Sequence, residues 1–483
     1  MSFVSMKIAG ADRVASDGRT FRRLNPITGA VASEAPAASV ADAIAAADAA
    51  AAAFPAWAAL GPNARRAALL KAADALAAKG DAFVAAMADE TGTTEPWARF
   101  NVMIAASMLR EAAALTTQVA GEVIPSDKPG CMAMAIREPA GVCLGIAPWN
   151  APVILGVRAL ATPLACGNAV VFKASEICPR THGLIVEALD EGGLPAGLVS
   201  LVTNAPEDAG EIVGALVDHP AVRRINFTGS TKVGRIIAER AARQLKPCLL
   251  ELGGKAPFLV LKDADLDEAV KAAIFGAFFN QGQICMSTER IILAPEIADE
   301  FVARFTTRAA VLKAGDPRDG KAPLGAVVDA HTVEKVTALI EDARGKGAEI
   351  HSAGAAEGVL MPAQVVDRVT ETMRIATEES FGPVVAIFRA RDEEDAIRLA
   401  NATEYGLSAA VFSKDVARAM TVARQIKSGI CHINGPTVHD EAQMPFGGTR
   451  DSGYGRFGGK AGIAEFTELR WITIETQPGH YPL

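Results

Sequence analysis

Residues 142–173, VCLGIAPWNAPVILGVRALATPLACGNAVVFK, contain the pattern that decides the fold of this chain. Two short apolar runs, 142–147 and 169–173, flank a stretch from Pro152 onward that has the composition of a buried helix. A strand, a helix and a second strand in this order form a βαβ unit, in which the two strands lie parallel in one sheet. The stretch therefore predicts an α/β fold.

The same alternation extends outward from this unit. Upstream, residues 40–60 and 63–120 are rich in alanine, which predicts helices. Downstream, further apolar runs alternate with helical patterns, and they lie at 198–202, 224–228, 249–252, 257–261, 290–293, 349–351, 384–388, 409–412 and 429–433. The helices between the later runs are expected at 264–281, 296–313, 329–346, 393–402 and 415–428. We expect two Rossmann-like, doubly wound units that meet near Gly253-Gly254.

Two apolar segments fit neither unit. Residues 131–137 (CMAMAIR) and 471–476 are predicted strands. Such strands pair with a neighbouring chain or pack back on their own domain, and the sequence is compatible with both.

Composition excludes several classes of protein. Half of the 483 residues are hydrophobic and the net charge is −8, which argues against disorder and against a nucleic-acid or anionic-membrane surface. The seven cysteines form no CxxC pair, so they indicate neither a disulfide framework nor a zinc site. The N-terminus lacks a signal-peptide pattern, and the apolar stretch 41–60 is interrupted by Asp42, Asp48 and Pro55. We expect a cytoplasmic protein with no membrane span.

Two motifs at strand ends suit a nucleotide. In FTGSTKVG (227–234), Gly229 and Gly234 permit close backbone approach and Ser230 can cap a helix whose N-terminus favours a phosphate. This is not GxGxxG, and taken alone such a turn is more often a simple helix cap. In KASE (173–176), Glu176 can accept both hydroxyls of an adenosine ribose and repel a 2′-phosphate, or form a solvated pair with Lys173.

Three further residues suit covalent chemistry. Cys285 closes FNQGQIC (279–285), where side-chain amides and a glycine surround it, a setting unlike that of a packed structural cysteine. Glu251 interrupts an apolar run before Gly253-Gly254, which indicates either a buried ion pair or a catalytic base. Asn150 follows the first strand and can donate to an oxyanion or cap the next helix.

Together, these groups match one reaction. A thiol, a base, an amide donor and a nucleotide-binding turn suit oxidation of an aldehyde through a thioester, with hydride transfer to a nicotinamide and hydrolysis by an activated water. No metal is required, and the chain contains no HExxH motif.

The chain resembles the NAD(P)-dependent aldehyde dehydrogenase superfamily over essentially its whole length. The motifs that carry the resemblance are PWN (148–150), KASE (173–176), FTGSTKVG (227–234), LELGGKAP (250–257), FNQGQIC (279–285), EESFGPV (378–384) and PFGG (445–448). The resemblance implies a nucleophile at Cys285, a general base at Glu251 and an oxyanion hole formed by Asn150 with the Cys285 N–H.

The resemblance also implies the cofactor residues and the domains. NAD is expected, with Lys173 and Glu176 at the adenosine ribose, Gly229 and Ser230 at the pyrophosphate, and Glu379 at the nicotinamide ribose. The cofactor cleft would further be lined by Trp149, Val233, Gly234, Leu252 and Phe381. The expected domains are a cofactor domain (1–122 and 141–252, with 446–468 returning to it), a catalytic domain (253–445) and a small oligomerisation arm (123–140 and 469–483), in a homodimer or homotetramer.

Two positions depart from the commoner family pattern. Ala151 replaces an aromatic residue and Arg158 replaces a tryptophan of the substrate tunnel. With REPAGVCLGIAPWNAP and ICMSTER, the chain resembles the branch that oxidises aromatic aldehydes such as salicylaldehyde, vanillin or benzaldehyde. Ala151, Arg158, Phe446 and Trp97 are the expected substrate residues, although Trp97 also suits helix packing and Arg158 a surface or intersubunit ion pair.

Other functions remain as alternatives. A CoA-acylating aldehyde dehydrogenase usually lacks the glutamate found here at position 251. A cysteine esterase would need Cys285 but not Lys173, Glu176 or Glu379. A structural protein on the same fold would have no need to retain Cys285 and Glu251 together.

Overall fold

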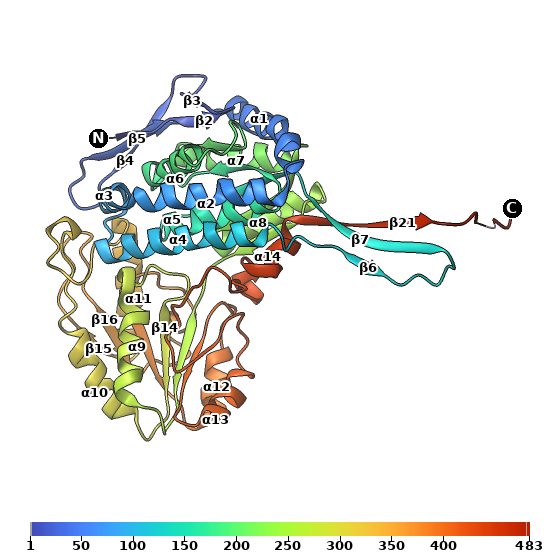
Figure 1. Ribbon diagram of the computed structural model, residues 1–483. Helices are drawn as coiled ribbons and strands as arrows, with labels where there is room; N and C mark the ends of the chain where they lie inside the picture. Colours follow the sequence, from blue (N-terminus) through green and yellow to red (C-terminus); the bar gives the residue numbers. More distant parts are fainter. Residues whose placement is uncertain (1, 480) are drawn as a thin grey trace.

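A computed structural model describes residues 2–479 and 481–483. Two large sheets with their helices form the upper and lower parts of the molecule, and a long arm projects from the side of the upper part (Figure 1). This arrangement confirms the predicted α/β fold class with two largely parallel sheets.

The first sheet has the order β20, β12, β11, β8, β9, β10, β2 and β3. The strands from β12 to β10 are parallel, and β20, β2 and β3 add antiparallel edges. In that order, the strands span Gly453–Tyr454, Cys248–Glu251, Val222–Thr228, Val142–Ile146, Ala169–Lys173, Val199–Val202, Met6–Ile8 and Ala11–Arg13.

Helices cover both faces of this sheet (Figure 1). On one face, α5 and α6 pack beneath α2, α3 and α4, and on the other face lie α1, α7 and α8. Proline occupies the first turn of α2, α4, α5 and α6, where its missing N–H leaves no helical hydrogen bond unmade. The helices α1 to α8 span Val40–Ala58, Pro62–Ala78, Gly80–Thr91, Glu95–Leu115, Pro152–Ala165, Pro179–Glu191, Ala209–Asp218 and Thr231–Arg243, and α14 spans Gly459–Glu465.

The second sheet has the order β15, β16, β17, β14, β13, β18 and β19. These strands span Glu349–Ser352, Gln364–Asp367, Val384–Arg389, Thr288–Leu293, Ala256–Val260, Ala410–Phe412 and His432–Ile433. Alternate side chains enter different cores, so that Phe258 packs with α9 and α10 while Leu259 packs with α11, α12 and α13. These helices span Leu266–Phe278, Ala298–Ala309, Ala330–Gly345, Glu393–Asn401 and Val416–Ala423.

The arm is a sheet of β21 (Thr467–Glu475), β7 (Cys131–Pro139) and β6 (Glu122–Ile124). Its strands are antiparallel and pair with each other, although they come from distant parts of the chain. Large apolar side chains on it are exposed, and they include Val123 at 76%, Leu469 at 61% and Trp471 at 76%. The arm therefore presents apolar surface that this chain does not cover.

Most predicted strands and helices are present, with shifts of a few residues at their ends. The predicted helix 63–120 is divided into α2, α3 and α4, and α3 ends at Gly92 in the left-handed conformation. Strands β2, β3 and β16 were not predicted from the sequence. The N-terminal strands β1 (Ser2–Phe3), β4 (Thr20–Leu24) and β5 (Val31–Pro36), which form a small separate sheet, were not predicted either. The division of the chain into domains at the expected boundaries stays a prediction.

Helix α1 meets the length and hydropathy of a membrane span, with a mean hydropathy of 1.2, and it alone does so in the described part of the chain. It contains Asp42 and Asp48, and it packs on β8, β9 and β10. Its alanines Ala43, Ala46 and Ala47 are fully buried in the core of the first sheet. These contacts are those of a core helix.

Candidate functional site

The order of the first sheet reverses beside β8. The chain continues from β8 to β9 and β10 on one side, and then crosses to β11 and β12 on the other. Loops that leave the carboxyl ends of β8 and β11 therefore diverge, and a crevice opens between them. Asn150 follows β8, and Gly229 with Ser230 follows β11.

A cavity of about 240 Å³ lies at this crevice. It is lined by nine of the predicted site residues: Trp149, Asn150, Gly229, Ser230, Glu251, Leu252, Cys285, Glu379 and Phe381. They come from both large sheets and from the loops between them. The fold thus brings the predicted thiol, carboxylate and amide to one place.

The approach of Glu251 to Cys285 depends on the turn that follows β12. A Cβ atom on Gly254 would lie 2.2 Å from the carbonyl oxygen of Cys285, so only glycine fits there. Close packing of these two backbone segments requires the glycine at position 254, whereas a Cβ atom at Gly253 would lie 3.0 Å from the Glu379 carboxylate.

The environment changes the acidity of both groups. Glu251 is fully buried, which raises the pKa of its carboxyl to about 7, and neither carboxylate oxygen has a hydrogen-bond partner among the described residues. Burial, and then the nearby Glu251 carboxylate, raise the pKa of the Cys285 thiol well above its usual value. The thiol therefore needs a base to ionise, and Glu251 is a base that titrates near neutral pH.

Side-chain amides hold the loop before Cys285. Asn280 and Gln281 have positive φ angles of 48° and 55°, which end the helical path of the chain after α9. The Gln281 side chain accepts from the Gly325 N–H at 3.0 Å and donates to the Ala326 carbonyl at 3.0 Å. The amides predicted to surround the thiol thus fix the loop that presents it.

Asn150 and Trp97 belong to the same network. The Asn150 Nδ2 donates to the Gln283 carbonyl at 3.0 Å, which uses one of its two N–H groups. The Trp97 Nε1 donates to the Asn150 carbonyl at 2.9 Å, and the indole is buried in the core. Trp97 thus packs in the core as part of α4, and its hydrogen bond fixes the position of the Asn150 loop.

A second cavity of about 490 Å³ adjoins the first at Trp149, Gly229 and Ser230. Val233 lines it, and so do Lys173 and Glu176, which form an ion pair. The Asn204 Nδ2 also donates to Glu176 at 3.0 Å. The Ser230 hydroxyl caps α8 by accepting from the Val233 N–H at 3.4 Å.

The remaining residues predicted to bind the cofactor contact one another or the neighbouring backbone. Gly234 packs on Leu252, because a Cβ atom at Gly234 would lie 2.5 Å from a Leu252 methyl group. Glu379 accepts from the Gly254 N–H at 2.8 Å, and burial raises the pKa of its carboxyl to about 7. Phe381 packs edge-on against Trp149, with 5.8 Å between the ring centroids.

Arg158 is buried and forms an ion pair with Asp440. Its guanidinium carbon lies 4.0 Å from the centroid of the Phe446 ring, and both residues line a small cavity of about 20 Å³ between α4 and α5. One oxygen of Asp440, Oδ1, is buried without a partner among the described residues. The Arg158 ion pair is therefore internal, neither on the surface nor between subunits.

Ala151 is buried at the start of α5. Its neighbours along that segment, Asn150 and Leu155, line the cavity that contains Cys285. Three further residues that line this cavity were not predicted from the sequence: Leu155, Thr228 and Lys335. Thr228 lies within the motif FTGSTKVG and Leu155 lies shortly after PWN, whereas no sequence signal marks Lys335.

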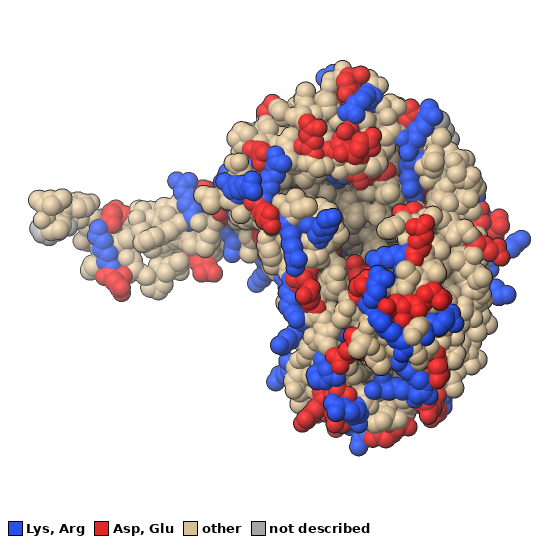
Figure 2. Space-filling model, turned by 180° about the vertical axis from the view of Figure 1, so that it is seen from behind, with Lys and Arg blue, Asp and Glu red and all other residues tan. Residues whose placement is uncertain are grey.

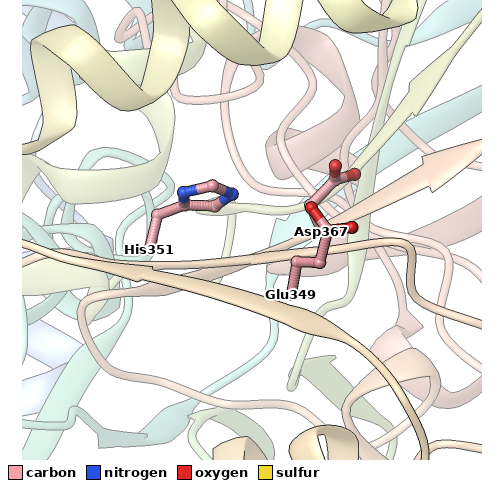
Figure 3. Close-up of side chains that lie close together, drawn as sticks. All are labelled: Glu349, His351 and Asp367. Atoms are coloured by element: carbon pink, nitrogen blue, oxygen red, sulfur yellow. The ribbon is translucent and has the colours of Figure 1, made fainter.

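A group with metal-ligand spacing lies on the edge strands β15 and β16. Glu349, His351 and Asp367 place ligand atoms within 4.8 Å of one another, on the same side of the strand pair (Figure 3). Arg368 donates to Glu349 at 2.6 Å and Arg389 to Asp367 at 2.9 Å. The two carboxylates thus belong to an ion-pair network.

The molecular surface in Figure 2 is hollowed between the two main parts of the body. Basic and acidic side chains are interspersed on this face, and the arm also carries charges of both signs. The mixed charge on this face contrasts with the basic stripe typical of nucleic-acid-binding proteins.

Comparison with known proteins agrees with these features. Residues 13–472 match the aldehyde dehydrogenase family. The chain is 58% identical over 480 residues to a vanillin dehydrogenase of Pseudomonas fluorescens, covering 99% of both chains. A salicylaldehyde dehydrogenase structure from Pseudomonas putida G7, complexed with salicylaldehyde, superposes with a TM-score of 0.98 at 49% identity and covers 100% of both chains.

A more distant structure has the same fold. Betaine aldehyde dehydrogenase of Staphylococcus aureus, in complex with NAD+, has a TM-score of 0.94 at 31% identity and covers 99% of this chain and 95% of its own. From the match over nearly the whole chain and the shared fold, this protein belongs to the aldehyde dehydrogenase family.

Proposed function

We propose that the protein oxidises an aromatic aldehyde to the carboxylic acid, with NAD as the hydride acceptor and a thioester on Cys285 as intermediate. The observation that carries this proposal is the meeting of Cys285, Glu251 and Asn150 in one cavity that opens into a second, larger one. The similar vanillin and salicylaldehyde dehydrogenases support an aromatic substrate.

The proposed reaction begins at the thiol. The Cys285 thiol gives its proton to the Glu251 carboxylate, which passes it to solvent, and the sulfur bonds to the carbonyl carbon, so that the carbonyl oxygen becomes an oxyanion. The second Nδ2 hydrogen of Asn150 and the backbone N–H of Cys285 stabilise that charge. Trp97 and the Gln283 carbonyl orient Asn150 for this role.

The larger cavity suits the cofactor in size and in chemistry. Its walls combine apolar side chains such as Val233 with the N-terminus of α8 at Gly229-Ser230, which favours a pyrophosphate. Lys173 and Glu176 would hold the adenosine ribose, and Glu379 and Phe381 the nicotinamide half. When bound, the nicotinamide supplies a hydride acceptor.

Glu251 completes the proposed cycle. Its carboxylate removes a proton from water, whose oxygen bonds to the thioester carbon, and the carbon–sulfur bond then breaks to release the acid and restore Cys285. The unpartnered carboxylate with a pKa of about 7 supports this assignment.

Charge pairing in the larger cavity favours NAD over NADP. A 2′-phosphate would meet Glu176, and the nearby cations are already engaged: Lys173 pairs with Glu176, and Arg240 pairs with Asp218. Lys173 also reduces the repulsion, so a preference rather than an exclusion is expected.

Ala151 supports an aromatic ring as the substrate. It leaves more room beside Asn150, which lines the cavity that contains Cys285, than an aromatic side chain would. The predicted contact of Arg158 with a phenol has no such support, because Arg158 is paired with Asp440 and lies with Phe446 at a separate cavity of about 20 Å³.

The exposed arm supports assembly into a homodimer or homotetramer. Trp471 and Leu469 add apolar area to a projecting sheet, and such surface marks protein contacts. We also propose the domain boundaries given above and a cytoplasmic location, which the odd number of cysteines without a CxxC pair supports.

For the base, turnover should rise with pH through an inflection near the Glu251 pKa of about 7, because the protonated carboxyl below that pH cannot accept a proton. Glu251→Gln should lower kcat by about 10²–10⁴-fold and remove the inflection. Steady-state kinetics across pH and mass spectrometry of the acyl-enzyme measure both, with inactive Cys285→Ala as reference. Near-normal turnover without acyl-enzyme would refute the role.

For the cofactor, kcat/KM should be about tenfold or more higher with NAD than with NADP, because of the like charges at Glu176. Glu176→Gln should reduce this ratio, and Glu296→Gln, at an exposed position outside the cavities, should leave it unchanged. Equal values for the two cofactors in the wild type and in Glu176→Gln would contradict the assignment.

For the substrate, absorbance of reduced nicotinamide should show a higher kcat/KM for salicylaldehyde or vanillin than for hexanal. Ala151→Phe should lower this ratio because the added ring occupies pocket space, whereas the similarly small side chain in Ala151→Ser should preserve it. A wild type that prefers hexanal, or a ratio untouched by the phenyl ring, would show that the pocket is not built for aromatic rings.

For the assembly, Trp471→Glu should weaken association by about 30-fold or more, since a buried tryptophan at an interface is a common hot spot. Size-exclusion chromatography with light scattering over a dilution series measures the effect. Val14→Glu, at an exposed apolar position outside the arm, is the control. A monomeric wild type would exclude the arm as an oligomer contact.

A further inference from the structure

A buried ion pair lies behind the loop that carries Glu379 and Phe381. The Lys255 ammonium and the Glu289 carboxylate contact each other, and their side chains are 0% and 5% exposed. Both occur in quoted motifs, LELGGKAP and ICMSTER, but neither lines the cavity that contains Cys285. Burying two charges is unfavourable unless further hydrogen bonds satisfy them, so their other partners indicate what the pair does.

Those partners are the backbone of the cofactor loop. The Ser380 N–H donates to both oxygens of Glu289, at 2.9 and 2.8 Å, and the Phe381 N–H donates to one of them at 3.0 Å. The Lys255 Nζ donates to the Ser380 hydroxyl at 3.2 Å. The pair therefore binds the segment immediately after Glu379.

The conformation of this segment requires such support. Phe381 has a φ of 52°, in the left-handed region that a bulky residue rarely adopts. Consecutive N–H groups in a bend of this kind can converge on an anion, and Glu289 supplies that anion. With its backbone fixed in this way, Phe381 packs its ring against Trp149.

Lys255 also connects the ion pair to the turn after β12, which contacts Glu379. Lys255 directly follows Gly254, whose N–H donates to Glu379 at 2.8 Å. The neighbouring Arg290 donates to the Lys255 carbonyl at 3.0 Å and to the carbonyls of Leu399 and Ala400 at 2.8 Å each, which fixes this segment to the sheet. Glu379 is thus fixed from two sides. The Gly254 N–H binds its carboxylate, and the Ser380 N–H that follows it in the chain binds Glu289, which is paired with Lys255.

We infer that Glu289, neutralised by Lys255, is a positioning residue that sets Glu379 and Phe381 for the nicotinamide half of the cofactor. The inference rests on the proposed binding of NAD. It assigns Glu289 to cofactor binding and not to the chemistry at Cys285, because its bonds go to the cofactor loop.

The test is Glu289→Gln, which keeps the size of the side chain but replaces one acceptor oxygen by a donor that faces backbone N–H groups. The Kd and KM for NAD should rise about 10- to 100-fold, the usual effect of losing hydrogen bonds to a charged group. Hydrolysis of para-nitrophenyl acetate, which needs Cys285 but no cofactor, should stay within about twofold of the wild type.

Two further variants make the result decisive. Glu289→Gln with Lys255→Met removes both charges together and should show the same loss of NAD affinity without leaving an unpaired buried charge. Glu268→Gln, in an exposed ion pair with Lys271, should behave as the wild type. Whether the wild type binds NAD at all tests the proposed function. The ratio of the Kd for NAD in the variant to that in the wild type tests the role of Glu289. A Kd for NAD unchanged in both Glu289 variants, or ester hydrolysis that falls in parallel with NAD affinity, would overturn the inference.

Discussion

Parallel pairing on both sides of β8 is the constraint on which the rest of the site depends. Because the chain leaves β8 toward β9 and returns to β11, the loops after β8 and β11 cannot pack on each other, and a crevice forms at the carboxyl ends of the strands. Asn150, Gly229 and Glu251 each lie at such a strand end. Their meeting is a result of topology, and the second sheet then adds Cys285 and Glu379 from the facing side.

Around this crevice the chain buries charge in two different ways. Glu251 has no hydrogen-bond partner in the described part of the chain, and burial raises the pKa of its carboxyl toward neutrality, which leaves its proton exchangeable. Glu289 is satisfied by a lysine and by two backbone N–H groups, which make it part of the framework. Two glutamates with similar burial thus differ in chemistry because their hydrogen-bond partners differ.

How far the sequence predicted this structure depends on the range of the interactions. The strands and helix within 142–173 could be predicted because apolar runs and Pro152 are local signals. Strands such as β2 and β16 were missed since three or four residues carry too little periodicity. The family's motif order located Cys285 and Glu251, whereas the partner of Arg158, Asp440, is 282 residues away and no local pattern connects them.

The fold alone leaves the substrate open, because betaine aldehyde dehydrogenase and salicylaldehyde dehydrogenase both superpose on this chain, with TM-scores of 0.94 and 0.98. Selectivity must therefore come from a few side chains on a common frame. Arg158 is paired with Asp440, and with Phe446 it lines a cavity separate from the one that contains Cys285. The walls of the cavity around Cys285, and not the shared fold, therefore distinguish one aldehyde from another.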